Sequence, residues 1–214
     1  MRLFALAALA GLTIAGAAYA RVWNDPGGRM TFDAPNGWAT TVERTSSPEN
    51  VYVISGSANN ECHFLSQPSP STATASADAV RRAGLDEARF QQDFWQQTAT
   101  GMPQLFPGGS AQFVSRSLDT SGFWPIQRAD LQGPERLIHM SIQLRPGVTL
   151  MSMCMTYSGA DPVAQYETAS RTLAHPNDAT WRAEAEAAEA ARAAAATAPP
   201  PAPEQPQEGR RRRN

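Results

Sequence analysis

Apolar and polar residues alternate along most of the chain between residues 21 and 176, and a period of two is typical of strands with one buried face. The stretch RMTFDAP at 29–35 follows the turn signal NDPGG, which predicts a hairpin that enters a sheet. NVYVISGS at 50–57 and ECHFLSQ at 61–67 predict a second hairpin across residues 58–60. The pattern predicts four further strands, at 111–119, 124–132, 136–145 and 148–158.

The connections between these last four strands are short turns at 120–123, 133–135 and 146–147. Parallel neighbours need a long crossover, so connections of this length predict an antiparallel meander.

Three stretches change to a helical period. Residues 76–84 begin at Ser76, a suitable N-cap, and residues 86–101 begin at Asp86 and place Phe90 and Phe94 four apart on one face. Residues 161–174 predict a last helix with Asp161 as its cap, Pro162 in its first turn, and an inward stripe of Val163, Tyr166, Ser170 and Leu173. Strands, helices, a meander and a final helix predict an α+β fold, with helices packed on an antiparallel sheet.

Residues 1–20 have the pattern of a secretory signal peptide, with Arg2 before an apolar run and small residues up to Ala20. Gly11 and Gly16 interrupt the run, and no basic stop-transfer flank follows, so a transmembrane anchor is the less favoured interpretation. We therefore expect cleavage after Ala20 and a periplasmic or secreted chain that begins at Arg21 and has no transmembrane span.

Composition changes sharply near residue 176, which predicts that the folded domain covers 21–176. Residues 177–198 form an Ala/Glu-rich segment whose only sizeable apolar residue is Trp181, so we expect a solvated helix with no face to bury. Residues 199–214 are rich in proline and predict a disordered, extended tail. The tail ends in four basic residues that could contact an anionic envelope surface, namely Arg210, Arg211, Arg212 and Arg213. A solubilising extension without a partner is the alternative.

The first strand stretch and the last helix carry a resemblance to a known family. WNDPGGRMTFDAPNGW at 23–38 resembles the opening hairpin of PsbP-like domains, and YETASRTL at 166–173 is similar to their C-terminal helix. The matched positions in the hairpin are Gly28, Phe32, Pro35, Gly37 and Trp38. The resemblance implies an α/β/α sandwich that binds or assembles with other proteins rather than catalysing a reaction. It transfers no catalytic residue, because the matched residues are turn and core positions.

The stretch MSMCMTYSG at 151–159 raises the question of a soft-metal site. In a strand, Met151, Met153 and Met155 share one face and Cys154 points to the other, so the methionines are better explained as core packing against a helix. A copper site would need ligands that converge, and the candidates are Cys62, His63, His139 and Met140. Cys62 and His63 are adjacent on a strand and face opposite ways. Two cysteines in an exported chain favour a Cys62–Cys154 disulfide over a metal.

The sequence contains only incomplete versions of two other catalytic or ligand-binding motifs. The stretch around Ser110 lacks the second glycine of a nucleophile elbow, and FPGGS at 106–110 lacks the Lys-Ser/Thr of a phosphate loop. The three histidines stand far apart, and His139 is better explained as a surface or hydrogen-bonded residue than as a general base. The tryptophans are better explained as core anchors than as a ligand platform.

The sequence thus predicts no catalytic, cofactor-binding or metal-binding residue and no cofactor. The net charge of −2 gives no reason to expect nucleic acid as a partner. Two function classes remain. The favoured one is a noncatalytic periplasmic binding or assembly domain that meets an envelope protein or surface. The alternative is a small-ligand carrier or an enzyme whose pocket the sequence does not reveal.

Overall fold

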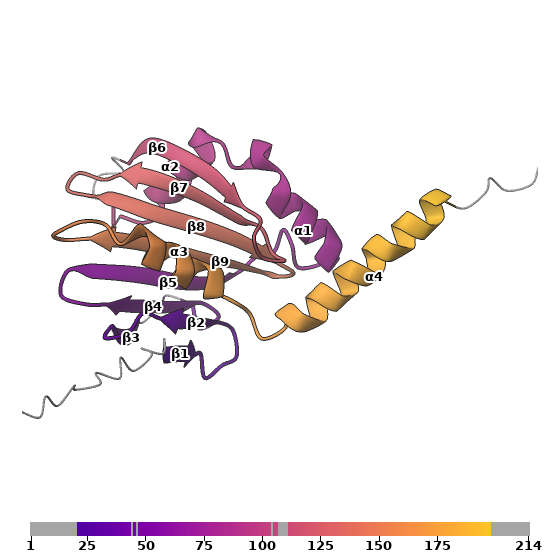
Figure 1. The fold of residues 1–214 in the computed structure, drawn as a ribbon, viewed down its shortest axis with the longest axis horizontal. Coiled ribbons are helices and arrows are strands. Elements are labelled where there is room, and N and C mark those ends of the chain that lie inside the picture. Colours follow the sequence, from indigo (N-terminus) through magenta and orange to yellow (C-terminus); the bar gives the residue numbers. More distant parts are fainter. Residues whose placement is uncertain (1–20, 44, 46, 104, 107–110, 198–214) are drawn as a thin grey trace, which may run out of the picture.

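The structure, a computed structural model, describes residues 21–197 except 44, 46, 104 and 107–110. Its main element is a seven-stranded antiparallel sheet in the order β3-β4-β5-β9-β8-β7-β6 (Figure 1). The strands are β3 (Ala39–Glu43), β4 (Val51–Gly56), β5 (Asn60–Pro68), β6 (Gln112–Asp119), β7 (Ile126–Gln132), β8 (Leu137–Arg145) and β9 (Val148–Thr156). The predicted β4–β5 hairpin and the β6–β9 meander are confirmed.

The first hairpin does not enter this sheet, contrary to the prediction. β1 (Arg21–Asn24) and β2 (Thr31–Ala34) pair only with each other among the named strands, as a separate two-stranded sheet. The backbone of Thr31 instead bonds that of Ala174, with both N–O distances at 2.9 Å. The ring of Phe32 stacks on Phe64 of β5, with centroids 3.9 Å apart. The hairpin is therefore held against one face of the sheet by aromatic packing and by the chain that leaves α3 (Val163–Thr172).

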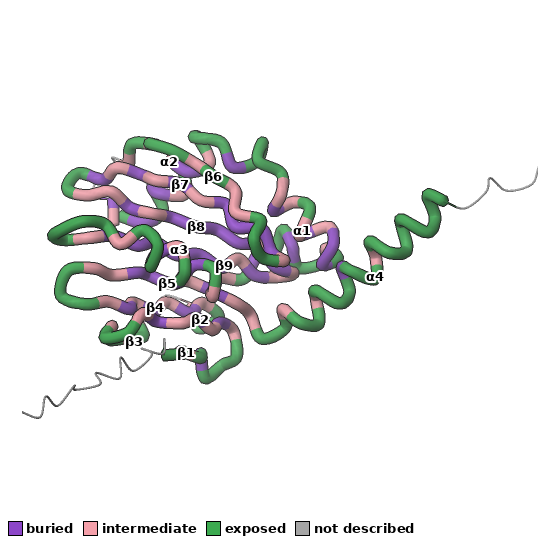
Figure 2. Tube along the Cα trace, in the orientation of Figure 1, coloured by how far each residue is buried: buried purple, intermediate pink, exposed green. Residues whose placement is uncertain are grey.

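Each face of the sheet has its own apolar core, and buried segments run along the central strands (Figure 2). On one face, the β1–β2 hairpin and Tyr166 of α3 pack against Phe64, Leu150 and Cys154. On the other, Trp95 of α2 (Gln92–Thr100) packs in a cluster that includes Met151, Met153 and Met155. The predicted α+β architecture and the role of the methionine row as core packing against a helix are both confirmed.

The helix that was predicted to begin at Asp86 is divided into two. Asp86 accepts a hydrogen bond from the backbone N–H of Ala88 (3.1 Å) and caps a short 3-10 turn, η1 (Glu87–Arg89). Phe90 then points into the core, and its carbonyl accepts a hydrogen bond from the indole of Trp95 (3.0 Å). Phe90 and Phe94 make the expected contact, edge to face with centroids 4.9 Å apart.

The caps of the two other predicted helices differ from each other. Ser76 caps α1 (Ala77–Leu85) as predicted, because its hydroxyl accepts from the backbone N–H of Ala79 at 3.3 Å. Asp161 does not cap α3, because its carboxylate faces His139 instead. Val163 is 42% exposed and does not belong to the inward stripe, which Tyr166, Ser170 and Leu173 form with Ala169.

The Ala-rich helix α4 (Asp178–Thr197) extends away from the sheet (Figure 1), and most of its residues are exposed. The expectation that it has no buried face is wrong for the part that contacts α1. Trp181 and Ala185 pack with Ala77 and Trp124, and small side chains on both helices allow the close approach. Further along, two charge-assisted bonds join Arg192 to Asp78 of α1, at 2.6 and 2.7 Å.

The predicted signal peptide at 1–20 and the tail at 199–214 lie outside the described residues. Among the helices that the structure describes, none is long and apolar enough to cross a membrane.

Candidate functional site

The sheet face beneath α3 is apolar on one half and polar on the other. Strands β4, β5 and β9 supply the apolar core, whereas β6, β7 and β8 present hydroxyl, carboxylate, imidazole and guanidinium groups to the same side. Strand register places these groups in rows across the sheet. The first row is Ser115, Asp130, His139, Cys154 and Cys62, and the second is Ser117, Arg128, Ser141 and Ser152.

A cavity of about 180 Å³ lies between these rows and α3. Tyr166, Glu167 and Ser170 of the helix line its other side. A drug-sized ligand occupies a pocket of about 300–1,000 Å³, so this cavity suits a few water molecules or a very small ligand. The Ser141 and Ser152 hydroxyls at its floor bond each other at 2.7 Å.

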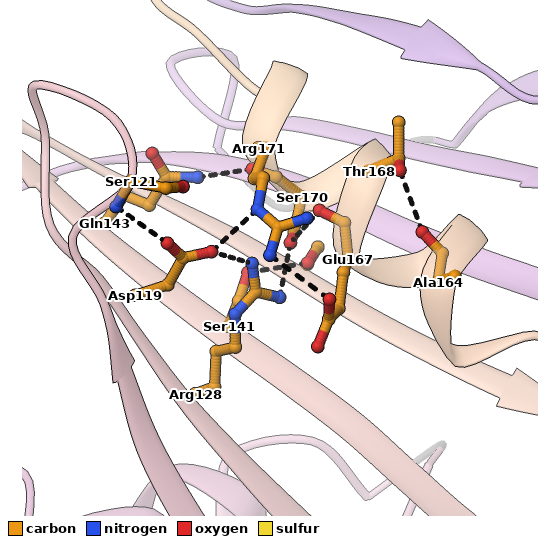
Figure 3. Close-up of polar contacts among 11 residues, drawn as sticks. Asp119, Ser121, Arg128, Ser141, Gln143, Ala164, Glu167, Thr168, Ser170 and Arg171 are labelled. Carbon is orange, nitrogen blue, oxygen red and sulfur yellow. Dashed lines mark hydrogen bonds and ion pairs between the residues drawn. The ribbon is translucent and has the colours of Figure 1, made fainter.

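One end of the site is held by a carboxylate between two guanidinium groups (Figure 3). Asp119 Oδ2 accepts from Arg128 of β7 and from Arg171 of α3, both at 2.8 Å. Burial works against the charged form of Asp119, but bonds from Ser121 and the two arginines outweigh it, and its pKa lies far below its usual range. Arg128 also donates to the hydroxyl of Ser170 at 2.7 Å. These contacts fasten α3 to the sheet.

The other end is held by a histidine between two carboxylates. His139 Nδ1 is 2.8 Å from Asp130 Oδ1, and Nε2 is 3.4 Å from Asp161 Oδ2. The hydrogen bond with Asp130 raises the pKa of His139 in spite of burial, and Asp161 adds to the effect. Both ring nitrogens can donate only in the protonated imidazolium, so the geometry favours the charged form.

This arrangement differs from a catalytic triad with a serine nucleophile in one hydrogen bond. Ser115 donates to Asp130 Oδ2 at 2.7 Å, and not to the imidazole of His139. A serine nucleophile needs the imidazole as the acceptor of its proton, with the carboxylate on the far nitrogen. The row can therefore hold a proton and position α3, but it does not activate the Ser115 hydroxyl.

The two cysteines face each other in the same row. Cys62 on β5 and Cys154 on β9 have Cα atoms 4.0 Å apart, and their sulfur atoms form a disulfide in the structure. His139 shares their sheet face, whereas His63 and Met140 lie on the opposite face. There His63 lines a cavity beside Tyr157, and Met140 packs in the cluster of Met151, Met153 and Met155. The sheet thus separates the four residues that a copper site would have to bring together.

A second polar cluster on the opposite face was not found from the sequence. His63 Nε2 is 2.7 Å from Glu61 Oε1, the Tyr52 hydroxyl bonds His63 Nδ1, and the Tyr157 hydroxyl donates to the same carboxylate. Burial, followed by Glu61, raises the pKa of Tyr157 to about 12. These groups border a cavity of about 450 Å³, where the guanidinium of Arg136 lies 4.3 Å from the Tyr157 ring. The spacing of Glu61 and His63, two apart in a strand, was the available signal.

A third, larger groove of about 660 Å³ runs between α1, η1, α2 and the sheet. Phe90, Phe94, Leu144 and Met151 give it apolar walls, and Arg89 stands among its lining residues. Its volume lies within the range of small-molecule sites. The basic residues predicted to contact an anionic surface, Arg210 to Arg213, lie outside the described residues.

Comparisons with known proteins give likenesses in structure only. No family model matches the chain, and no curated protein matches it in sequence. Its fold is similar to the solution structure of cyanobacterial PsbP (CyanoP) from Synechocystis sp. PCC 6803, at 14% identity and a TM-score of 0.49, over 78% of this chain and 98% of that one. A crystal structure from Bacteroides thetaiotaomicron is similar at 12% identity and a TM-score of 0.44, over 75% of this chain and 50% of that one, so the chain spans half of that protein.

The first of these is a PsbP protein, in agreement with the PsbP-like fold expected from the opening hairpin and the last helix. Both TM-scores lie below 0.5, and we draw no argument about function from either structure.

Proposed function

We propose that the chain is a noncatalytic periplasmic binding or assembly domain of the bacterial envelope. The observation that supports it is the state of the polar groups beneath α3, which satisfy one another. Asp119 is neutralised by two arginines, and Ser115 donates to an acid rather than to a base. Within the described part of the chain, no serine, threonine or cysteine side chain is hydrogen-bonded to a histidine. Such a network stabilises a scaffold, and beneath α3 no hydroxyl of the described residues is bonded to the imidazole of His139.

Two features support an exported location. Residues 1–20 have the pattern of a cleaved signal peptide, and disulfides such as Cys62–Cys154 form and persist in oxidising compartments. Intact mass of the protein from the periplasmic fraction is expected to show the loss of residues 1–20, with Arg21 first. A protein that keeps these residues in the membrane fraction would contradict the proposal.

The partner in this proposal is an envelope protein, an anionic envelope surface, or both. Arg210 to Arg213 suit the surface, because guanidinium groups match phosphate and carboxylate geometry. Crosslinking in intact cells followed by mass spectrometry tests the protein partner. Reproducible crosslinks to one envelope protein are expected, and crosslinks confined to cytoplasmic proteins would refute the assignment.

A small-ligand carrier is a second candidate, and the groove of about 660 Å³ beside α2 favours it. The groove is large enough for a small molecule, and apolar side chains and several serine and threonine residues line it. This function would not require any reacting group, so it agrees equally well with the network beneath α3.

A further inference from the structure

The groove beside α2 has an apolar body. Four of its lining residues are large and apolar: Phe90 and Met151 are almost fully buried, and Phe94 and Leu144 are partly buried. Ile142 from β8 continues this surface. Such a surface binds hydrocarbon or aromatic groups through the area that it removes from water.

The charge of the groove comes from one residue. Among the described residues that line the groove, Arg89 at the end of η1 is the only charged one, and none of them is acidic. Arg89 is exposed and forms no ion pair with any residue that the structure describes. Its neighbour Glu87 is bound elsewhere, to Arg116 at 3.0 Å. An unpaired guanidinium beside an apolar groove is complementary to a ligand with one negative charge.

From this complementarity we infer that the groove binds a small amphiphilic acid, with its apolar part against Phe90, Phe94 and Met151 and its carboxylate on Arg89. The guanidinium fork matches a carboxylate in two parallel hydrogen bonds, and charge-assisted bonds are about twice as strong as neutral ones. The inference deepens the small-ligand carrier function and rests on it. It names the ligand class and does not depend on the network beneath α3.

The test compares decanoate with decanol, two probes that share a chain and differ in the charge of the head group. Isothermal titration calorimetry on the purified protein measures both affinities, below the concentration at which decanoate forms micelles. Decanoate should bind about tenfold more tightly than decanol, and Arg89→Gln should remove most of that preference while decanol binding stays the same. Arg21→Gln is the matched control, since Arg21 is also exposed and without an ion pair in the described chain but lies on β1, away from the groove.

Shifts of backbone amide NMR signals locate the site and should be largest around Phe90, Phe94 and Met151. Equal affinity for decanoate and decanol, or a preference that Arg89→Gln leaves intact, would overturn the acid as ligand and leave an uncharged ligand for the carrier. If neither probe binds, or if the shifts lie elsewhere, the inference fails together with the carrier function. In that case the binding or assembly function stands, because the crosslinking experiment tests it separately.

Discussion

Arg145 is the most deeply buried charged side chain of the described chain, at 2% exposed, and it fixes the start of α4. Its guanidinium bonds Asp178 at 2.7 and 3.2 Å and Gln143 at 3.0 Å, and lies 4.5 Å from the Trp124 ring. Burial lowers the pKa of Arg145, and Asp178 opposes that effect. The ion pair therefore joins a strand to a helix that the sequence alone suggested was free.

Removal of the carboxylate should be costly. Asp178→Ala leaves the guanidinium of Arg145 buried without its counter-charge, and loss of one partner of a buried pair costs about 3–5 kcal/mol. Urea unfolding measures the change. Glu184→Ala, at an exposed position of the same helix, should stay within about 0.5 kcal/mol. Equal effects of the two substitutions would show that Asp178 does not hold Arg145.

His139 gives the fold a dependence on pH. The pKa of His139 is higher in the folded protein than in the unfolded chain. The stability that protonated His139 contributes is therefore complete below the unfolded pKa of about 6.5 and is lost as pH rises through the folded pKa. Asp130 and Asp161 are the ionisable groups that face His139. Burial lowers the pKa of His175, so this second histidine titrates at lower pH than His139 does.

The free energy of unfolding of the native protein should therefore fall as pH rises above about 6.5, the unfolded value, and through the raised pKa of His139, and His139→Gln should flatten this dependence. Urea midpoints at several pH values give both curves. A variant whose curve stays parallel to that of the native protein would refute the role of His139.

At the scale of elements, the disulfide joins β5 to β9 at the centre of the sheet and closes a loop across a sequence separation of 92 residues. In the chain-entropy model a loop of this length contributes about 4–5 kcal/mol. The double substitution Cys62→Ser and Cys154→Ser should lower the thermal midpoint clearly. Reduction should lower the midpoint of the native protein in the same way and leave the variant unchanged. Free reaction of both thiols with a maleimide in the native protein, without denaturant, would show that the bond is not formed.

Most of the sheet could be predicted because apolar and polar residues alternate along much of β4 to β9, although β8 and β9 lie between the two cores and are buried on both faces. β3 was missed because its sequence, ATTVE, is short and largely exposed at the edge of the sheet. The sequence could also place Ser115, Asp130 and His139 each on a strand. Whether they form one row depends on strand register, because a shift of one residue turns a side chain to the other face of the sheet.

The contacts of α4 could not be predicted for a different reason. Its partners, Asp78 on α1 and Arg145 on β8, are remote in sequence, and the helix itself has little apolar surface. Such long-range ion pairs leave no periodic pattern in either segment. The same is true of the ion pair between Asp119 at the end of β6 and Arg171 of α3, two residues that are 52 positions apart in sequence.

At the scale of the whole molecule, the terminal arginines should attach the protein weakly to anionic surfaces. Each arginine near such a surface contributes about 1 kcal/mol, and salt screens the attraction. The protein should co-sediment with anionic vesicles at low salt and be released at high salt. A chain that ends at residue 197, which keeps α4 and its contacts with α1, should not co-sediment. The full chain with Arg210 to Arg213 replaced by glutamine is the matched control. If the full chain, the shortened chain and the glutamine variant sediment equally and salt has no effect, the terminal arginines do not attach the protein to anionic surfaces.

The central claim is that this α+β domain acts by binding and not by catalysis. Three exposed apolar side chains on different parts of the surface are suitable probe positions, namely Val42 on β3, Val114 on β6 and Val163 on α3. The most direct test places a photocrosslinking amino acid at each of these positions in turn and irradiates intact cells. The account predicts a discrete product with one envelope protein from at least one position, and Glu184 on α4 serves as an exposed polar control. The absence of a discrete product from all three, or a product with a cytoplasmic protein, would contradict it.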